Sequence, residues 1–424
     1  MLQRPASAAS GPDAAACQTP LRVGMIFLTD PSNPAQLSGM PYRMAEALRG
    51  QGVEVVPILG GDPGSRDLWA RGVSRLRREA RRRIPHRLRA AVDDLNAERT
   101  RRDVLRRAER LSRRVEAQLA GRRLDLLFGV CISTALYDLR TDLPVVYFSD
   151  ATSPLLHRTY PALAARGRSR RAALEEVERA SLSRATVAAF ASPRTMRSAV
   201  EELGLDPGRA SVIPMGAHVT PVDPATVTAP AEPPTPRSCR LVIVAADPVR
   251  KRVDLAVRAT EALRSRGIAA TLTVIGPATR LAARSGFVEC AGRLRLDDPD
   301  DLHEHRRLLR GCHLQVLPSV GEAFGIAPAE SAHFARPAVV SDAGGLPSVV
   351  RHDESGLVLP VEADHRAWAD AIAGLVHDPD RYRRYSVAAL ARARDELNWS
   401  AWATRTIALM RRALAETRKE NDAA

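Results

Sequence analysis

The chain contains few aromatic residues and few cysteines, and each shortage narrows what the protein can be. Aromatic side chains make up only 4% of the 424 residues, so its cores must be built mainly from aliphatic side chains. The five cysteines are scattered without a pair at metal or redox spacing, which argues against a disulfide framework or zinc site and for a reducing compartment. No run of about 18 apolar residues occurs, so no membrane-spanning helix is predicted.

Short apolar runs separated by helical stretches recur along the whole chain, and 45% of its residues are hydrophobic. Continuous apolar strands that alternate with helices are typical of parallel sheets covered on both faces. A chain of this length also exceeds one ordinary core. The sequence therefore predicts an α/β fold with two doubly wound, Rossmann-like domains. The predicted strands are residues 22–28, 53–59, 124–130, 144–148, 187–191, 211–214, 241–245, 271–275, 287–290, 314–317, 338–341 and 357–359.

Composition divides the chain into segments. Residues 1–20 are polar and rich in Ala, Ser and Pro, which predicts a disordered tail without a signal peptide. Residues 221–238 hold six prolines and no apolar periodicity, which predicts an extended linker. We expect the first domain to cover residues 21–220, the second domain residues 239–385, and C-terminal helices residues 386–424.

The net charge of +14 comes almost entirely from residues 66–123, where 20 arginines stand against 8 acidic residues. This segment predicts one or two arginine-rich helices inserted into the first domain and split near Pro85. Two interpretations stay open: a solvated helical insertion, or a basic amphipathic surface for anionic lipid or a polyanionic acceptor. Nucleic acid is not expected, because no aromatic residue follows Trp69 among these arginines to stack on bases. The apolar face would consist of Leu105, Ala108, Leu111, Val115 and Leu119.

The most informative block is residues 317–330, LPSVGEAFGIAPAE. A strand is predicted to end just before its glycine-bearing loop, and Pro328 suits the first turn of a following helix. Glu322 in the loop and Glu330 in the helix would then lie at the carboxyl end of a strand, where open α/β sheets bind ligands. A carboxylate can accept hydrogen bonds from two neighbouring hydroxyl groups of a ribose or hexose. Taken alone, Glu330 could equally serve only the helix dipole.

This block resembles the E-x7-E motif of the family 4 retaining glycosyltransferases, also described as glycosyl transferases group 1. Glu322 and Glu330 match the two glutamates, and Phe324-Gly325 match the Phe-Gly between them. Residues 337–347 resemble the family's glycine pair after the next strand, and residues 352–357 resemble the turn that follows. The resemblance implies the GT-B fold, two Rossmann-like domains facing a central cleft, with a C-terminal helix that crosses back to the first domain.

A basic loop follows the predicted strand 241–245 and contains Arg250 and Lys251. The resemblance implies that this loop neutralises the diphosphate of a donor, with Lys251 the better match. The family's usual Gly-Arg is replaced here by Ala245-Ala246, so its separate phosphate arginine is either absent or displaced onto Arg250 or Arg252. A solvated basic turn is the alternative.

The first domain shows weaker similarities. Gly39 lies in a segment that resembles the family's flexible glycine loop, and Asp150 lies in one that resembles an S-D-A-T segment; the resemblance implies that both face the acceptor or the cleft. A simple turn at Gly39 and a helix cap at Asp150 are the alternatives. His218 replaces the usual Asn of the turn at the domain junction. Residues 128–133 lack the histidine that many family members place near the sugar, so no catalytic histidine is assigned.

The resemblance implies a retaining, metal-independent glycosyltransferase that moves a sugar from a nucleotide diphosphate donor to a hydroxyl of a glycan, lipid-linked or small-molecule acceptor. No cofactor is expected beyond the nucleotide-sugar co-substrate, and no metal, because the acidic residues 297–301 are interpreted as helix caps. Glu322 and Lys251 are predicted to be catalytic. The predicted donor-binding residues are Arg250, Lys251, Glu322, Phe324, Gly325 and Glu330.

Two other functions stay open. One is a nucleotide-sugar epimerase on the same fold. The other is a non-catalytic or degenerate GT-B subunit that binds an anionic lipid or polymer through the arginine-rich helices. The expected location is cytoplasmic, with peripheral contact to the anionic inner face of the membrane left open.

Overall fold

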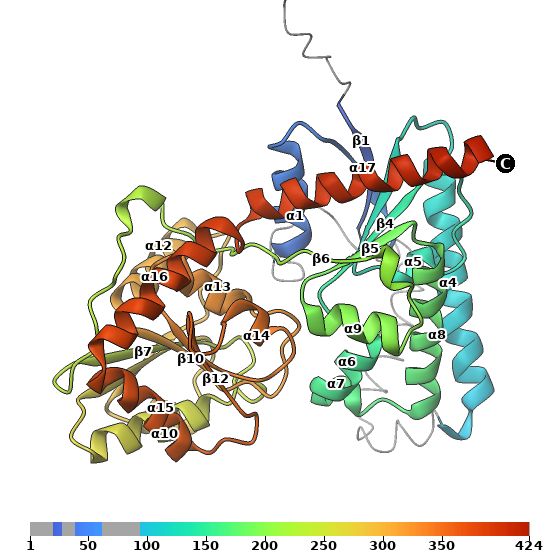
Figure 1. Cartoon of the computed structure of the whole chain (residues 1–424). Helices are drawn as coiled ribbons and strands as arrows, with labels where there is room; N and C mark the ends of the chain where they lie inside the picture. Colours follow the sequence, from blue (N-terminus) through green and yellow to red (C-terminus); the bar gives the residue numbers. More distant parts are fainter. Residues whose placement is uncertain (1–19, 28–38, 62–93, 424) are drawn as a thin grey trace, which may run out of the picture.

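The computed structural model describes residues 20–27, 39–61 and 94–423, and it contains two domains, each built on a six-stranded parallel sheet (Figure 1). The strand orders are β2-β1-β3-β4-β5-β6 and β12-β11-β10-β7-β8-β9. The prediction of two doubly wound domains is confirmed. Within the described residues, none of the helices combines the length and the apolar character needed to cross a bilayer.

The first sheet consists of strands that are buried on both faces in its centre, as their continuous apolar sequences predict. Its strands are β1 (Arg22–Phe27), β2 (Glu54–Leu59), β3 (Leu126–Val130), β4 (Val145–Ser149), β5 (Val187–Phe190) and β6 (Ala210–Val212). The helices of this domain are α1 (Met40–Arg49), α4 (Ala97–Leu119), α5 (Ser133–Leu136), α6 (Ser153–Thr159), α7 (Pro161–Ala164), α8 (Arg168–Arg184) and α9 (Pro193–Glu201).

Helix α4 is the described part of the arginine-rich segment, and residues 66–93 lie outside the described residues. It connects β2 to β3 and packs against α5 and α8, with Val104, Ala108, Leu111 and Val115 buried. The predicted apolar face is therefore covered by the protein's own core, while most of the helix's arginines are exposed. This half of the segment belongs to the helical layer of the domain, which differs from the insertion we predicted.

In the second sheet, the order in which successive strands are added reverses between β7 and β10, the two central strands. Ligands of open α/β sheets bind outside the carboxyl ends of the strands at such a switch point. Its strands are β7 (Cys239–Val244), β8 (Ala270–Ile275), β9 (Val288–Gly292), β10 (Leu314–Leu317), β11 (Ala338–Ser341) and β12 (Gly356–Leu359). Its helices are α10 (Val253–Ser265), α11 (Arg280–Arg284), α12 (Pro299–Gly311), α13 (Ile326–Ala332), α14 (Leu346–Val349), α15 (His365–His377) and α16 (Pro379–Asp395).

The proline-rich residues 221–238 lie against the second domain (Figure 1). The Ala231 N–H donates to Ser386 Oγ at 2.7 Å, and Arg394 donates to the carbonyl of Val227 at 3.0 Å. The chain passes from the first domain to the second before this segment, just after β6, because Val219 already packs in the second domain's core. Residues 221–238, predicted to be a linker, are therefore attached to the second domain. Their carbonyl and N–H groups form hydrogen bonds with side chains of α16.

Helix α17 (Trp399–Ala423) returns from the second domain and lies across the first (Figure 1). Trp402 packs with its ring 6.0 Å from that of Phe128 and 5.8 Å from that of Phe148. The outgoing and returning chains touch where they pass between the domains: a Cβ atom at Gly216 would lie only 2.5 Å from the Trp399 nitrogen. The predicted crossing helix is confirmed, and it ties the two domains together beside their junction.

Candidate active site

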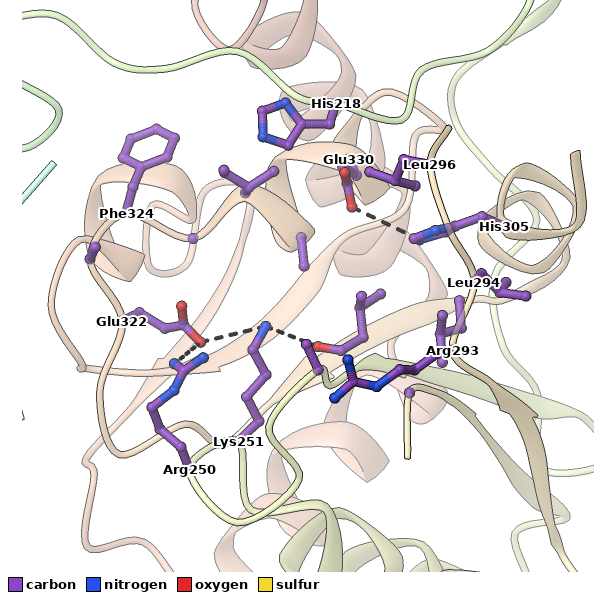
Figure 2. A pocket seen from close by; sticks show the side chains of 18 of the residues that line it. His218, Arg250, Lys251, Arg293, Leu294, Leu296, His305, Glu322, Phe324 and Glu330 are labelled. Atoms are coloured by element: carbon purple, nitrogen blue, oxygen red, sulfur yellow. Dashed lines mark hydrogen bonds and ion pairs between the residues drawn. The ribbon is translucent and has the colours of Figure 1, made fainter. Parts of the chain in front are cut away.

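A cavity of about 570 Å³ lies between the two domains. The second domain contributes the loops that follow β7, β9 and β10, together with α12 and α13, while the first domain contributes Asp150 and Tyr160. Figure 2 shows its second-domain side, with one cluster around Glu322 and another around Glu330. The predicted donor-binding residues Arg250, Lys251, Glu322, Phe324, Gly325 and Glu330 all line this cavity.

Glu322, from the loop after β10, contacts two cations from the loop after β7 across the sheet's switch point. Arg250 Nη1 donates to Glu322 Oε1 at 2.9 Å, and Lys251 Nζ lies 3.6 Å from the same oxygen. Ser319 Oγ also donates to this oxygen at 3.1 Å, and Lys251 Nζ donates to the carbonyl of Val244 at 3.0 Å. All three charged side chains are at least 85% buried. Two buried cations thus face one buried carboxylate, while a half-exposed aspartate three residues before Arg250 lies 3.7 Å from the Arg250 Nε.

Arg250 also connects the domains. Its guanidinium lies 5.0 Å from the ring centroid of Tyr160, which follows α6 in the first domain. Next to this contact, a Cβ atom at Gly321 would overlap the carbonyl oxygen of Thr159, so the two backbones approach closely. Burial raises the pKa of Tyr160 to about 12, and its aromatic ring lies against the guanidinium in a cation–π contact.

Asp150 stands at the carboxyl end of β4 and faces the Glu322 side of the cavity. Burial, with a smaller effect of the Glu322 charge, raises the pKa of Asp150 above its usual value. Cys131 Sγ donates to Asp150 Oδ1 at 3.5 Å. The cap of α6 is Thr152, whose hydroxyl accepts from the Leu155 N–H, so capping does not explain Asp150.

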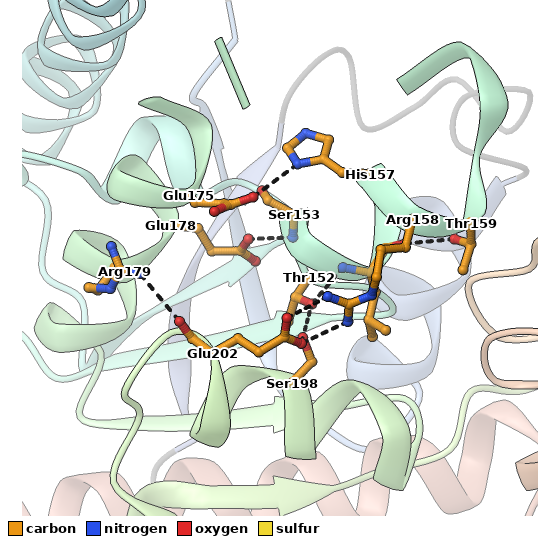
Figure 3. A network of polar contacts seen from close by, with 11 residues as sticks. Thr152, Ser153, His157, Arg158, Thr159, Glu175, Glu178, Arg179, Ser198 and Glu202 are labelled. Carbon is orange, nitrogen blue, oxygen red and sulfur yellow. Dashed lines mark hydrogen bonds and ion pairs between the residues drawn. The ribbon is translucent and has the colours of Figure 1, made fainter. Parts of the chain in front are cut away.

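A polar network holds the start of α6, just after β4, against the neighbouring helices (Figure 3). Glu178 of α8 is buried and accepts from the Ser153 N–H at 2.6 Å and from the Tyr147 hydroxyl at 3.3 Å. Its burial raises its pKa. On the next helix, Glu202 accepts from Arg158 at 2.8 Å and from Ser198 at 2.7 Å. The first-domain wall of the cavity is therefore anchored on two neighbouring helices.

Glu330 forms the second cluster. It is 3% exposed, and its Oε1 accepts from the Val219 N–H at 3.1 Å. Burial raises the pKa of Glu330 to about 8 and lowers the pKa of His305 to about 4. Although His305 Nε2 lies 3.9 Å from Glu330 Oε2, both groups are therefore mainly neutral at pH 7, and they do not form an ion pair.

Close backbone approaches and a positive φ explain why the matched motifs have glycine at these positions. A Cβ atom at Gly344 would overlap the carbonyl oxygen of Glu322, and one at Gly345 would lie 2.7 Å from the Phe324 Cα. Gly325 starts α13 with a φ of 114°, which other residues rarely adopt. The glycine pair thus lets the loop after β11 press against the loop that carries Glu322.

Gly39 does not line this cavity, whereas the acidic residues 297–301 contain a helix cap, as their sequence predicts. Gly39 precedes α1 with a φ of 81° and is not among the residues that line this cavity, while Ser38 and the loop before it lie outside the described residues. Asp298 caps α12 by accepting from the N–H groups of Asp300 and Asp301. In the described part of the chain, no three His, Cys, Asp or Glu side chains are grouped to hold a metal ion.

Tyr160 and His305 were not found from the sequence. Tyr160 has no local pattern that indicates a contact with the other domain. His305 has a weak signal, because it lies at helical spacing from Leu302, Leu308 and Leu309 on the apolar side of α12.

Two facing Rossmann-like domains with a cavity between them define the GT-B architecture. Family models match both halves: the glycosyl transferase 4-like domain matches residues 40–216, and the glycosyl transferases group 1 model matches residues 238–378. The chain therefore belongs to the family 4 glycosyltransferases, the glycosyl transferases group 1, with the GT-B fold. The resemblance predicted from the E-x7-E block is confirmed.

Individual relatives match parts of the chain. The α-maltose-1-phosphate synthase of Mycolicibacterium smegmatis is 37% identical over 118 residues, which are 27% of this chain and 30% of that protein. A D-inositol 3-phosphate glycosyltransferase of Nocardia farcinica is 31% identical over 216 residues, 46% of this chain and 46% of that protein. The chain thus spans less than half the length of these two relatives.

Solved structures share the fold over nearly the whole chain. The sucrose-phosphate synthase of Thermosynechococcus elongatus has a TM-score of 0.64 and 19% identity, covering 93% of this chain and 100% of that one. An α,α-trehalose-phosphate synthase of Burkholderia vietnamiensis has a TM-score of 0.61 and 14% identity, covering 94% and 99%. Both likenesses extend across the two domains.

Replacing Tyr160 tests the contact between the domains. Tyr160→Ala removes the ring from Arg250, and the lost cation–π interaction of about 1 kcal/mol should make amide exchange in residues 318–325 about fivefold faster. The measurement is hydrogen–deuterium exchange by mass spectrometry. Tyr160→Phe keeps the ring and should exchange like the wild type; exchange in the alanine variant equal to that of the wild type would contradict the contact.

Proposed function

We propose that the protein is a retaining, metal-independent glycosyltransferase that transfers a sugar from a nucleotide diphosphate donor to an acceptor hydroxyl. The observation that carries this proposal is the gathering of Arg250, Lys251, Glu322 and Glu330 in one cavity between the domains. These residues come from two segments that lie far apart in the sequence, and each residue type matches one part of such a donor.

The positive end of the cavity suits the diphosphate. A departing nucleotide develops negative charge on its terminal phosphate, and positioned cations stabilise that charge most strongly in a buried site. Arg250 and Lys251 are already fixed by Glu322, Tyr160 and the Val244 carbonyl, so little reorganisation is needed when the donor binds. These two cations would supply the charge that a divalent metal supplies in other transferases, which supports a metal-independent reaction.

The two glutamates suit hydroxyl groups. Glu322 directs Oε1 to its cations, which leaves Oε2 to accept hydrogen bonds from the transferred sugar. Glu330, in the other cluster of the cavity in Figure 2, would accept from the ribose diol. The apolar Leu294 and Leu296 beyond it would contact the base.

The acceptor would approach from the first domain. Asp150 lines the same cavity as Glu322, and its buried carboxyl group would accept a hydrogen bond from the acceptor hydroxyl. In a retaining transfer the acceptor hydroxyl attacks the face of the anomeric carbon from which the nucleotide leaves, and the departing phosphate takes the proton. The close approach of the domains at Gly321 and Thr159 would exclude water and limit hydrolysis.

Acceptor chemistry is best sought first among phosphorylated polyols, because one relative carries the name D-inositol 3-phosphate glycosyltransferase. UDP-, GDP- and ADP-sugars should be screened by thermal shift, since a bound donor raises the apparent stability. The stabilising donor is then incubated with D-inositol 3-phosphate and other acceptors. Product anomers are assigned by NMR, and an inverted product would contradict the retaining reaction. Conversion of the donor without an acceptor would instead indicate an epimerase.

Lys251→Ala tests the catalytic role of the cation. We expect kcat/KM to fall by about 10²-fold, because the charge on the leaving phosphate loses a stabilising partner. Lys419→Ala is the matched control, since it removes the other lysine of the chain from an exposed site near the end of α17. Equal kinetics for both variants would contradict the assignment. Added EDTA should leave the wild-type rate unchanged.

Glu330 gives donor binding a pH dependence. Its pKa of about 8 means that it is mainly protonated below pH 8, whereas the carboxylate accepts from both ribose hydroxyls. Donor affinity should therefore rise with pH by up to about tenfold per unit and level off above pH ~8. Calorimetric titration of the nucleotide diphosphate between pH 6 and 9 measures this. In Glu330→Gln, the part of this rise in affinity that comes from Glu330 should disappear. An equal rise with pH in both proteins would contradict the assigned role of Glu330.

A further inference from the structure

Within the described part of the chain, the buried histidine beside Glu330 has no hydrogen-bond partner for either of its ring nitrogens. His305 of α12 is 4% exposed and lines the cavity beside Glu330 (Figure 2). Among the described residues, neither its Nδ1 nor its Nε2 has a hydrogen-bond partner. Buried polar side chains in folded proteins nearly always have one.

The other buried histidines differ. The Nδ1 of His313 accepts from the Arg240 N–H at 2.9 Å, and His333 Nε2 lies 3.1 Å from the carbonyl oxygen of Leu397. His218 also lacks partners, but its ring stacks flat on Trp399 at 5.5 Å, so packing accounts for its position. His305 is the buried histidine of the described chain that faces the cavity with no aromatic ring stacked on it and no hydrogen bond.

His305 and Glu330 are spaced so that one hydroxyl group can form hydrogen bonds with both side chains. Their nearest atoms, Nε2 and Oε2, are 3.9 Å apart, which is beyond hydrogen-bond distance. A hydroxyl group has one hydrogen to donate and two lone pairs. It can therefore donate to a carboxyl oxygen of Glu330 and accept from an imidazole N–H at the same time, which gives both side chains a partner.

Helix α12 holds the imidazole rigidly in this place. Leu308 and Leu309, one turn further along, pack in the core with Val219 and Ile275. Arg306 donates to the carbonyl of Thr220 at 2.8 Å, which ties the helix to the segment whose N–H groups approach Glu330. Since burial keeps His305 neutral, it offers one N–H donor at physiological pH.

We propose that His305 and Glu330 together bind the ribose diol of the donor, with His305 donating to one hydroxyl oxygen, so that His305 selects ribonucleotides over deoxyribonucleotides. This inference rests on the proposed nucleotide-sugar function and adds a specificity-determining residue to it. A deoxyribose would leave the imidazole N–H and one carboxylate lone pair unpaired in a buried site, which lowers affinity.

The test compares UDP, GDP and ADP with their 2′-deoxy and 3′-deoxy counterparts by calorimetry. The wild type should prefer a ribonucleotide by about tenfold or more over at least one deoxy form, as expected for the loss of buried hydrogen bonds. In His305→Leu this preference should fall below about threefold, whereas His305→Gln, which retains an N–H donor, should keep most of it. His303→Leu, on the exposed side of the same helix, is the control and should keep the full preference.

The outcomes separate the two proposals. The affinity ratio of two ligands for one variant does not depend on how much of that variant is folded, so a destabilised protein still gives an answer. Unchanged preferences in His305→Leu would overturn the role of His305 while leaving nucleotide binding intact. Failure of the wild type to bind any of the three ribonucleotides would contradict the proposed function itself.

Discussion

The cavity depends on the ion pairs of one carboxylate, that of Glu322, with the two cations Arg250 and Lys251. This carboxylate brings Arg250 and Lys251, from the loop after β7, to the loop after β10, and so joins the two sides of the sheet's switch point. Two buried cations share this one buried carboxylate, which favours an anion at this end of the cavity. Because Arg250 also stacks on Tyr160, the same ion pair couples the charge to the contact between the domains.

Most of the fold could be predicted from the sequence, because continuous apolar runs between helical stretches indicate the buried strands of a parallel sheet. The strand predicted at residues 314–317 is β10, with identical bounds. The proline-rich residues 221–238 were harder, since prolines exclude a helix but do not say what surface the chain lies on. The arginine-rich helix was predicted with its apolar face, yet its packing partner α8 is more than 40 residues away, beyond local patterns.

The candidate site was predictable where one loop carries it. Glu322, Phe324, Gly325 and Glu330 stand in one block, and their spacing fixes them near the end of one strand. Tyr160 could not be predicted, because its role depends on how closely the domains approach. His305 differs again: it lies on an apolar helical face, where a histidine usually only packs, and its proximity to Glu330 appears only in three dimensions.

A crystal structure with the nucleotide diphosphate that best stabilises the protein tests the central claim most directly. The account predicts the terminal phosphate within hydrogen-bond distance of Arg250 and Lys251, and the ribose hydroxyls against Glu330. A nucleotide bound in the opposite direction, or outside the cavity between the domains, would contradict it.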